Sequence, residues 1–530
     1  MARNLLAGTI RLLRSTLVSR RLTLRQHVQS SLKRSVFDGV LWMSAGNGAR
    51  ALLKVAVLAT LARLITPDEF GIVAGAGIAV WLSLVFSSLG VGPALIQRST
   101  VDAAHVETAA AASTLFGIVT AAIVVAAAPA VEALLRIPGL APILRGMALV
   151  FPLAGLASVA ECMLQREFRF AAIARAELIS YTLGYGIVGI GLALAGVGAW
   201  ALVGAEIVKA VVKTIAMLRD VPNSRRLRLH RGALGDLLHF GTGYTAAALT
   251  TYVVAQGDNV VVARVLGVSA LGVYGRAYEL MLVPAQAIGM LLDKVLFPAL
   301  ARVQEEPERL RLAYRRATSL VALLVMPLSG AAIVLAPELV AALLGMGWTR
   351  AIVPFQILTL GMYFRVGYMI GHSVANATGA ARAVAWRNAL FAALVVFFAV
   401  IGARRGLVGV SIGVLVAMAV NFAMIFHLGA RITGLTTASF IGMHLPAALL
   451  TAVVGLEAWG VAVAMRGREV PAVVSLIVAG LAIAPTLLLM VRMLPAALGE
   501  DGRWLTDLLC RNAPAPLAPL LRRALLRTPS

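Results

Sequence analysis

The sequence predicts an all-α, polytopic membrane protein with about fourteen transmembrane helices, arranged as two parallel-repeat six-helix lobes plus two C-terminal helices. Of its 530 residues, 60% are hydrophobic and only 13% are charged, about half the charge of a typical soluble protein. Apolar runs of about 20 residues, each long enough to cross a bilayer core of about 30 Å, follow one another almost without pause. One stretch in the first half of the chain recurs in the second half at a fixed spacing.

The apolar runs define the candidate spans, and the connections between them are too short to hold a separate soluble domain. The spans cover residues 37–62, 70–95, 106–130, 143–163, 171–195, 198–218, 237–262, 270–298, 315–335, 351–375, 383–402, 406–430, 440–464 and 470–492. The shortest connections are the hairpins near Gly196 and Arg404.

The net charge of +23 indicates membrane orientation rather than nucleic-acid binding, because the basic residues lie in short connections and are not interleaved with aromatic residues. With the N-terminus in the cytoplasm, 30 of the 47 Lys and Arg residues fall on the cytoplasmic side and eight on the opposite side. This is the positive-inside pattern. The sequence therefore predicts that both termini are cytoplasmic and that no nucleic acid is bound.

These features divide the chain into six segments. They are a basic N-terminal segment in the cytoplasm or on the membrane surface (1–36), the N-lobe with six spans (37–218), a basic cytoplasmic linker (219–236), the C-lobe with six spans (237–430), the last two spans (431–494) and a cytoplasmic tail rich in Pro and Arg (495–530). The first segment is typical of an amphipathic helix on an anionic membrane, with a disordered basic tail as the alternative. It lacks the apolar core of a cleavable signal peptide.

An internal repeat relates the two lobes. The stretch ARLITPDEFGIV begins at Ala62, and ARVLGVSALGVY begins at Ala263, at an offset of 201 residues. Both copies lie in the hairpin between the first two spans of their lobe. Six spans separate the copies, and because six is even, both have the same orientation. The repeat therefore predicts a pseudo-twofold axis along the membrane normal.

Ionisable residues inside the predicted spans are the candidate site residues, since each costs about 2.5–3.5 kcal/mol at the centre of a membrane helix. Asn47, Arg50 and Lys54 share one face of the first span, with no acid on that face within a turn. Arg365 lies well inside the tenth span, with no acid nearby in its own helix. A guanidinium suits phosphate oxygens, so these residues are candidates for binding an anion in a central cavity. A cross-helix salt bridge is the alternative for Arg50.

Three further charges of the C-lobe form a second group. Arg276 and Glu279 are three residues apart and are expected to pair with each other or with Asp258 across the short hairpin. If that pairing fails, Asp258 becomes the candidate for ion coupling, because a buried carboxylate can carry a proton. At the repeat offset Arg50 corresponds to Thr251. A charge that is present in only one copy of the repeat favours a functional role for that residue. Sequence drift after duplication is the alternative.

The sequence shows no pattern for a metal or a cofactor. The seven histidines have no ligand spacing, and no glycine-rich phosphate loop is present, so direct coupling to ATP is not expected. Cys162 and Cys510 are far apart and are not expected to form a disulfide. Trp200, Trp348 and Trp459 fall at predicted membrane interfaces, where aromatic residues are enriched.

Four stretches carry a resemblance to a known family: LARLITPDEFGIVA, SSLGVGPALIQR, LQREFRF and GDNVVVARVLGVSALGVYGRAYEL. They resemble the polysaccharide transporter family, the Wzx-type flippases of the multidrug/oligosaccharidyl-lipid/polysaccharide (MOP) superfamily. The resemblance covers roughly residues 36–430 and is greatest to the exopolysaccharide subgroup of the colanic-acid or succinoglycan type. It implies movement of undecaprenyl-pyrophosphate-linked oligosaccharide units across the bacterial inner membrane by alternating access, for exopolysaccharide, lipopolysaccharide or O-antigen biosynthesis.

The implied substrate has three chemical parts, which are a pyrophosphate, a sugar chain and a long isoprenoid. Its transport requires cations within the membrane, polar groups for the sugar and a lateral opening for the lipid tail. The resemblance further implies contact with membrane lipids, association with a polysaccharide polymerase and export machinery, and no cofactor.

Other functions remain open at this point. A peptidoglycan-precursor (lipid II) flippase has similar chemistry, whereas a MATE-like drug antiporter needs acids for organic cations, and the deep charges here are mostly basic. A polytopic polymerase or glycosyltransferase usually needs a sizeable outer loop with catalytic acids or arginines. The longest outer loops, near 131–142 and 336–350, are short, and each holds a single acid, Glu132 or Glu338. The sequence therefore predicts a transporter rather than an enzyme.

Overall fold

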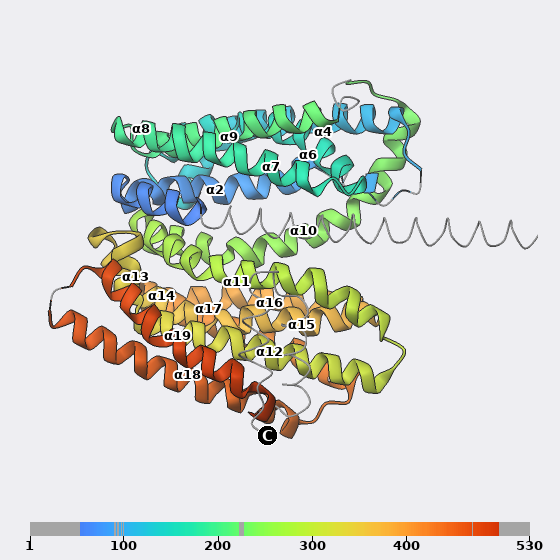
Figure 1. Cartoon of the computed structure of the whole chain (residues 1–530). Coiled ribbons are helices and arrows are strands. Elements are labelled where there is room, and N and C mark those ends of the chain that lie inside the picture. Colours follow the sequence, from blue (N-terminus) through green and yellow to red (C-terminus); the bar gives the residue numbers. More distant parts are fainter. Residues whose placement is uncertain are drawn as a thin grey trace, which may run out of the picture.

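The computed structural model describes residues 53–88, 92, 95, 96, 98, 100–221, 227–468 and 470–497. Within these residues the chain forms helices joined by short connections, and no strand is found among them. The all-α prediction is therefore confirmed. Long helices run side by side along the molecule, as Figure 1 shows.

The described part of the N-lobe begins with a helix over residues 53–64, which belongs to the first predicted span and is called here the first helix. The elements that follow are α2 (Pro67–Ser88), α4 (Ala103–Leu135), α5 (Leu140–Met147), α6 (Val150–Arg166), α7 (Phe170–Tyr181), the π-helix η1 (Thr182–Gly189), α8 (Ile190–Leu194) and α9 (Ala199–Asp220). The longest of them, α4, begins where the Asp102 carboxylate accepts the His105 N–H at 3.0 Å. That hydrogen bond holds the pKa of the Asp102 carboxyl below its ordinary value.

The C-lobe and the C-terminal pair contain the remaining helices. They are α10 (Arg231–Leu266), α11 (Val268–Arg302), α12 (Pro307–Val334), α13 (Ala336–Leu343), the 3₁₀ segment η3 (Met346–Ala351), α14 (Ile352–Leu360), α15 (Met362–Ala377), α16 (Ala381–Ala403), α17 (Gly406–Thr433), α18 (Thr437–Arg466) and α19 (Ala472–Ala497). Each of the fourteen predicted spans overlaps a helix of the N-lobe, of the C-lobe or of the C-terminal pair. In some spans the helix is broken into shorter pieces.

Nine helices in the described part of the chain are long and apolar enough to cross a membrane by length and composition. α9 is not among them because five of its 22 residues are ionisable. The tenth span is not among them because it is broken at Gly361 into α14 and α15, of 9 and 16 residues. The protein is an integral, multi-pass membrane protein, and the broken tenth span carries the candidate site residue Arg365.

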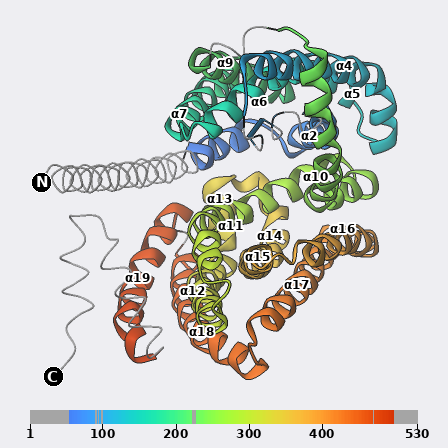
Figure 2. The same ribbon diagram turned by 90° about the vertical axis from the view of Figure 1, so that its right-hand side faces the viewer.

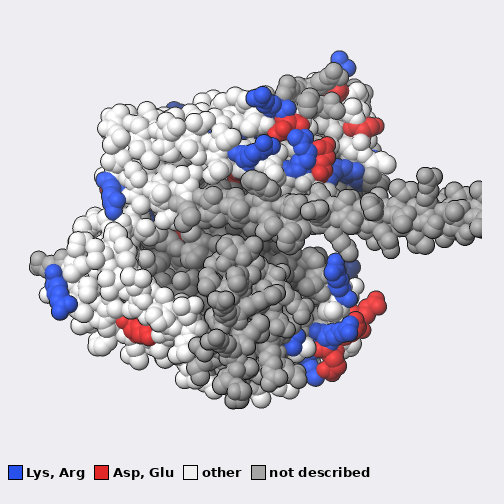
Figure 3. All heavy atoms as spheres, in the orientation of Figure 1, with Lys and Arg blue, Asp and Glu red and all other residues white. Residues whose placement is uncertain are grey.

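The bundle has two distinct ends. The connections 65–66, 195–198, 267 and 404–405 lie at one end, called here the hairpin end. Residues 227–230 and the connections 303–306 and 378–380 lie at the other, called here the linker end. In Figure 1 the hairpin end is on the left and the linker end on the right. Figure 3 shows that charged side chains on this face gather toward the linker end, while most of the remaining described surface is uncharged.

The two lobes meet at the repeated hairpins. Pro67 and Val268 begin α2 and α11, and Gly71 and Gly272 lie one turn further along the same helices. A Cβ atom on Gly71 would overlap the Val268 carbonyl, and one on Gly272 would overlap the Pro67 carbonyl. The contact is thus reciprocal between residues at the repeat offset, as a twofold relation requires. Glycine at both positions lets the two helices approach backbone to backbone.

The C-terminal pair packs on the outside of the C-lobe. Figure 2, a view along the helices, shows the N-lobe in one half of the molecule and α18 and α19 on the far side of α12. An apolar cluster that includes Leu335, Val454 and Ala458 joins these helices to the lobe. At the hairpin end, Arg466 Nε of α18 also lies 2.6 Å from Glu338 Oε1 of α13.

Candidate functional site

One carboxylate connects the two lobes about halfway along the helices. Glu279 of α11 lies with Oε1 2.8 Å from Lys54 Nζ of the first helix, and with Oε2 2.5 Å from Arg276 Nη1 of its own helix. The Lys54 side chain is 38% exposed, whereas that of Glu279 is 18% exposed. Lys54 therefore has an acidic partner in this structure, supplied by the opposite lobe.

Aromatic rings extend this lobe contact toward the hairpin end. The Arg276 guanidinium lies 4.8 Å from the centre of the Phe70 ring, and Phe70 meets Trp348 edge to face at 5.5 Å. The Trp348 indole N–H donates to the Ala62 carbonyl at 2.8 Å, and the side chain is almost fully buried. The opposite lobe therefore covers Trp348, so this ring does not face lipid as part of an aromatic belt.

Asp258 of α10 is held by neighbours of its own lobe. Its carboxylate accepts the Tyr274 hydroxyl at 2.7 Å and the Asn259 N–H at 2.9 Å. Asp258 is 2% exposed. Arg276 pairs with Glu279, so Asp258 keeps a neutral hydroxyl as its side-chain partner. Its role in ion coupling stays a prediction.

Arg365 of α15 lies beside a group of tyrosines. Its guanidinium is near enough to Tyr278, Tyr368 and Asp258 for their charges to interact. Within the described residues, however, it has no hydrogen-bond or ion-pair partner. An arginine has five N–H donors, so this side chain retains its full capacity to bind an anion.

The N-lobe contributes a polar group formed by side chains of α9 and η1. Glu206 and Lys209 of α9 form an ion pair at 2.8 Å, and the Tyr185 hydroxyl donates to Glu206 at 2.8 Å. Tyr181 stacks on Tyr185 at 5.1 Å. Tyr185 lies in the neighbourhood of Glu279, so this N-lobe group is near the lobe contact.

The local helix geometry explains why Tyr185 reaches α9. Tyr185 lies in η1, which widens the fifth span to a π-helix, a feature often found at functional sites. Gly184 packs directly against Ala205 and Lys209 of α9, which brings the two helices close together. The spacing of Glu206 and Lys209 is visible in the sequence, but the register that aligns Tyr185 with them is not.

Nearer the linker end, a second ion-pair network lies within the N-lobe. Lys213 Nζ of α9 lies 3.0 Å from Glu161 of α6 and 2.9 Å from Glu177 of α7. These residues bind one another rather than a ligand. The structure thus separates a self-contained network from the charges at the lobe contact.

Two cavities are lined by residues close in sequence to the charged group, although none of the charged side chains lines either cavity. A cavity of about 220 Å³ is lined almost entirely by apolar side chains of the first helix, α11, α12, α13, α14 and α15, including Val55, Leu280 and Met281. A cavity of about 300 Å³ between α10, α15 and α16 is lined by Thr251, Tyr368 and other residues. Lys54 and Glu279 adjoin residues of the apolar cavity in sequence.

The candidate residues therefore fall into three sets. Lys54 and Arg276 both contact Glu279, and Asp258 and Arg365 lie near each other without forming an ion pair. The last set, Asn47 and Arg50, lies outside the described residues. Lys54, Glu279 and Arg365 lie about 15–20 Å from the hairpin end of their spans at 1.5 Å per residue, which is near the middle of a bilayer core.

Comparison with known proteins gives the family context of this site. Residues 60–353 match the family model described as polysaccharide biosynthesis protein. Lipopolysaccharide biosynthesis protein WzxC of Escherichia coli K12 is 24% identical over 397 residues, covering 74% of this chain and 80% of that protein. Teichuronic acid biosynthesis protein TuaB of Bacillus subtilis 168 is 24% identical over 437 residues, covering 81% and 90%. Succinoglycan biosynthesis transport protein ExoT of Rhizobium meliloti 1021 is 27% identical over 318 residues, covering 60% and 64%.

Solved structures show the same fold. The lipid II flippase MurJ in an inward closed conformation superposes with a TM-score of 0.66 at 11% identity, over 78% of this chain and 92% of that one. An inward-facing MATE family transporter of the MOP superfamily superposes with a TM-score of 0.57 at 18% identity, over 72% and 94%. Both comparisons concern the fold alone.

Proposed function

Since the chain belongs to the polysaccharide biosynthesis protein family, among the polysaccharide transporters of the MOP superfamily, we propose that it is a flippase for undecaprenyl-pyrophosphate-linked oligosaccharide units. The proposed membrane is the bacterial inner membrane, with both termini in the cytoplasm. The linker end then faces the cytoplasm and the hairpin end faces outward. A polysaccharide polymerase and export machinery are the proposed partners that receive the flipped unit.

The observation that carries this proposal is Arg365. A guanidinium inside a membrane span is costly unless it is paired, and within the described residues Arg365 has no such partner. A pyrophosphate supplies the missing negative charge and accepts parallel N–H bonds from a guanidinium. Lys54 of the opposite lobe is the second cation proposed to contact the same anion.

The other parts of the substrate have matching surroundings. The apolar cavity of about 220 Å³, which Val55, Leu280 and Met281 help to line, suits part of an isoprenoid chain. The sugar is proposed to contact the polar N-lobe group of Tyr185, Glu206 and Lys209. Stacked tyrosines beside a carboxylate offer both an apolar face and hydrogen-bond acceptors.

The lobe contact suggests how binding leads to movement. A pyrophosphate that attracts Lys54 competes with Glu279 for the same ammonium group. The substrate therefore binds more tightly to a state in which the lobes have separated at this point, and a ligand shifts an equilibrium by its differential affinity for the two states. Opening of the hairpin end then follows substrate binding in alternating access.

A lipid II flippase is the second candidate, favoured by the similarity in fold to MurJ. Both substrates present a pyrophosphate and an isoprenoid, so the charged site serves either. Depletion of the chain separates the two functions. Loss of surface polysaccharide with normal cell-wall growth supports the oligosaccharide substrate, whereas lysis with polysaccharide retained supports lipid II.

The test of the site is Arg365→Ala in cells whose only copy carries the change. We expect export to fall about tenfold or more, because each charge-assisted hydrogen bond contributes about 1.5–3 kcal/mol. Lipid-linked intermediates are expected to accumulate while the protein stays in the membrane. Arg404→Ala, an exposed arginine at the hairpin end, is the matched control. Full export by Arg365→Ala would remove Arg365 from the site.

A further inference from the structure

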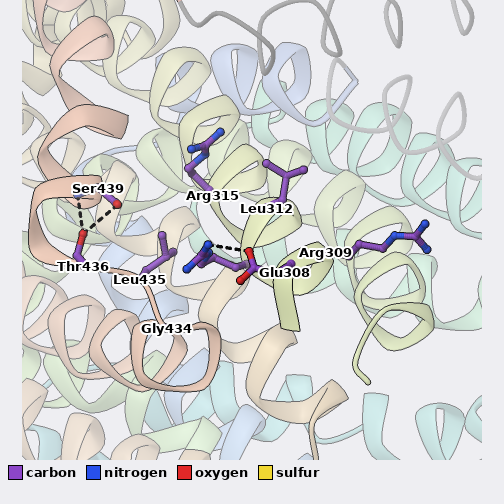
Figure 4. A pocket seen from close by; sticks show the side chains of 9 residues that line it. Glu308, Arg309, Leu312, Arg315, Gly434, Leu435, Thr436 and Ser439 are labelled. Carbon is purple, nitrogen blue, oxygen red and sulfur yellow. Dashed lines mark hydrogen bonds and ion pairs between the residues drawn. The ribbon is translucent and has the colours of Figure 1, made fainter. Parts of the chain in front are cut away.

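A hollow at the linker end lies apart from the transport site. It has a volume of about 450 Å³ and lies between the first turns of α12 and the connection from α17 to α18. Figure 4 shows Thr436 and Ser439 on the left, and Arg315 and Leu312 above Glu308 to their right. The hollow therefore lies at the joint between the C-lobe and the C-terminal pair.

The lining of the hollow is predominantly basic. Arg309, Arg311 and Arg315 contribute three cations against the single carboxylate of Glu308. Arg311 Nη2 lies 2.7 Å from Glu308, which leaves the other donors of this guanidinium available. Arg309 extends away from the hollow in Figure 4 and pairs with Glu306 at 2.9 Å. Arg311 and Arg315 are thus the cations that border the space.

Hydroxyl groups complete a set of donors suited to a phosphate. The Thr436 and Ser439 hydroxyls lie 3.0 Å apart at the start of α18, and both residues line the hollow. Orientation in the membrane requires only that basic residues lie in the connections. It does not require two guanidinium groups and two hydroxyls around one cavity, so their arrangement indicates an anionic ligand.

The position of the hollow indicates that this anion is attached to a lipid. α18 begins at the hollow and exposes Ile441, Leu445 and Leu449 over its first turns. In a membrane, acyl chains contact that apolar stripe close to the hollow. Leu312 and Leu435 in the lining provide apolar contact for the part of a lipid next to its phosphate.

The two ends of the C-terminal pair also differ in how they are attached. At the hairpin end, Arg466 and Glu338 join α18 to α13. At the linker end the corresponding joint contains the arginine-lined hollow. We propose that this hollow binds the phosphate headgroup of an anionic phospholipid, which holds α18 against α12 at the linker end. This inference is independent of which substrate the protein transports.

The test uses the purified full-length protein in nanodiscs of phosphatidylcholine, without and with phosphatidylglycerol. We expect phosphatidylglycerol to raise the Tm of the wild-type protein and to remain bound in native mass spectrometry. In Arg311→Gln/Arg315→Gln we expect both effects to be lost, with lipid affinity reduced about tenfold or more. The control Arg404→Gln/Arg405→Gln removes two exposed arginines at the hairpin end and is expected to behave as wild type.

Two further arms make the test decisive. Equal retention of phosphatidylglycerol by Arg311→Gln/Arg315→Gln and wild type overturns the proposal, as does inorganic phosphate alone reproducing the Tm shift in phosphatidylcholine. If the double arginine variant does not fold, Thr436→Val/Ser439→Ala keeps all charges and removes the hydroxyl donors. We expect it to retain less phosphatidylglycerol than wild type, and unchanged retention contradicts the proposed site.

Discussion

At the scale of single residues, Glu279 has the largest consequence for the contact between the lobes. It neutralises Lys54 of one lobe and Arg276 of the other. Arg365 is the opposite case, a cation with no protein partner among the described residues. In this site, Lys54 and Arg276 share one carboxylate at the lobe contact, and Arg365 is the cation proposed to bind a ligand.

Removing the Glu279 charge is expected to loosen the lobes. Glu279→Gln leaves Lys54 and Arg276 without a counter-charge, at a cost of about 1–3 kcal/mol for a partly buried pair. The measurement is labelling of an Ala62→Cys reporter by a membrane-impermeant maleimide, in a chain whose native cysteines are serines. Labelling should become faster, while Glu206→Gln, which acts within the N-lobe, should leave it unchanged. An unchanged rate in Glu279→Gln contradicts the proposed link between the lobes.

At the scale of elements, the repeated hairpin forms the contact between the lobes. The residues that the two copies of the repeat share lie where α2 and α11 cross. The two glycines at this crossing allow backbone contact. The repeat that first indicated two lobes is thus also the place where they meet at the hairpin end.

Adding one methyl group at this crossing is expected to separate the helices. In Gly71→Ala or Gly272→Ala the new Cβ overlaps a carbonyl of the other lobe, which costs about 1–3 kcal/mol as overpacking. We expect a lower Tm of the purified protein. Gly77→Ala is the matched control because its Cβ meets nothing within 4 Å, and helix propensity makes it neutral or stabilising. Equal Tm values for Gly71→Ala and Gly77→Ala would show that the helices do not cross so closely.

A second contact between elements links the C-terminal pair to the site helix. The Tyr363 hydroxyl of α15 contacts His444 Nε2 of α18, while His444 Nδ1 lies 2.7 Å from the Phe440 carbonyl. Tyr363→Phe leaves this imidazole nitrogen without a partner, so we expect a loss of about 1–3 kcal/mol in stability. Thermal unfolding measures it. Tyr363→Phe/His444→Leu removes both polar groups and should recover most of the lost stability. If the double variant is no more stable than Tyr363→Phe, the effect comes from packing and not from the hydrogen bond.

The sequence predicted the elements better than the contacts between them. Each span predicted from hydropathy overlaps a helix, and nine helices of the described residues are long and apolar enough to cross a membrane. The offset of 201 residues relates the two hairpins that meet in the structure. The partner of Lys54 was not predictable, because Glu279 is distant in sequence and meets it only after the lobes pack. The burial of Trp348 was not predictable for the same reason, since hydropathy locates a residue along the membrane normal but does not show which lobe covers it.

At the scale of the whole molecule, the described contacts join the lobes toward the hairpin end. Arg63 donates to the Ala342 carbonyl at 2.6 Å, Trp348 to Ala62, and the crossing glycines lie beside them. Transport by alternating access requires these contacts to break in each cycle. The structure therefore represents a state with the hairpin end closed.

A reversible cross-link across this closed end is expected to stop transport. Arg63→Cys and Ala342→Cys, joined by a reducible bifunctional thiol reagent, tie the two lobes together. The control pair Glu457→Cys and Thr486→Cys joins α18 to α19, whose side chains are within hydrogen-bond distance, and does not restrain the lobes. Flipping should cease in the first pair and return on reduction. Undiminished flipping by the cross-linked first pair would contradict opening at this end.

The central claim is that the chain itself moves a lipid-linked oligosaccharide and that Arg365 holds its pyrophosphate. The most direct measurement is flipping of undecaprenyl-pyrophosphate-linked oligosaccharide in proteoliposomes that contain only the purified protein, assayed by the substrate's accessibility to a glycan-binding probe outside. Transfer by wild type, with a rate lower by about tenfold or more in Arg365→Ala and retained in Arg404→Ala, is the predicted result. No transfer by the purified protein, or equal rates for wild type and Arg365→Ala, would contradict it.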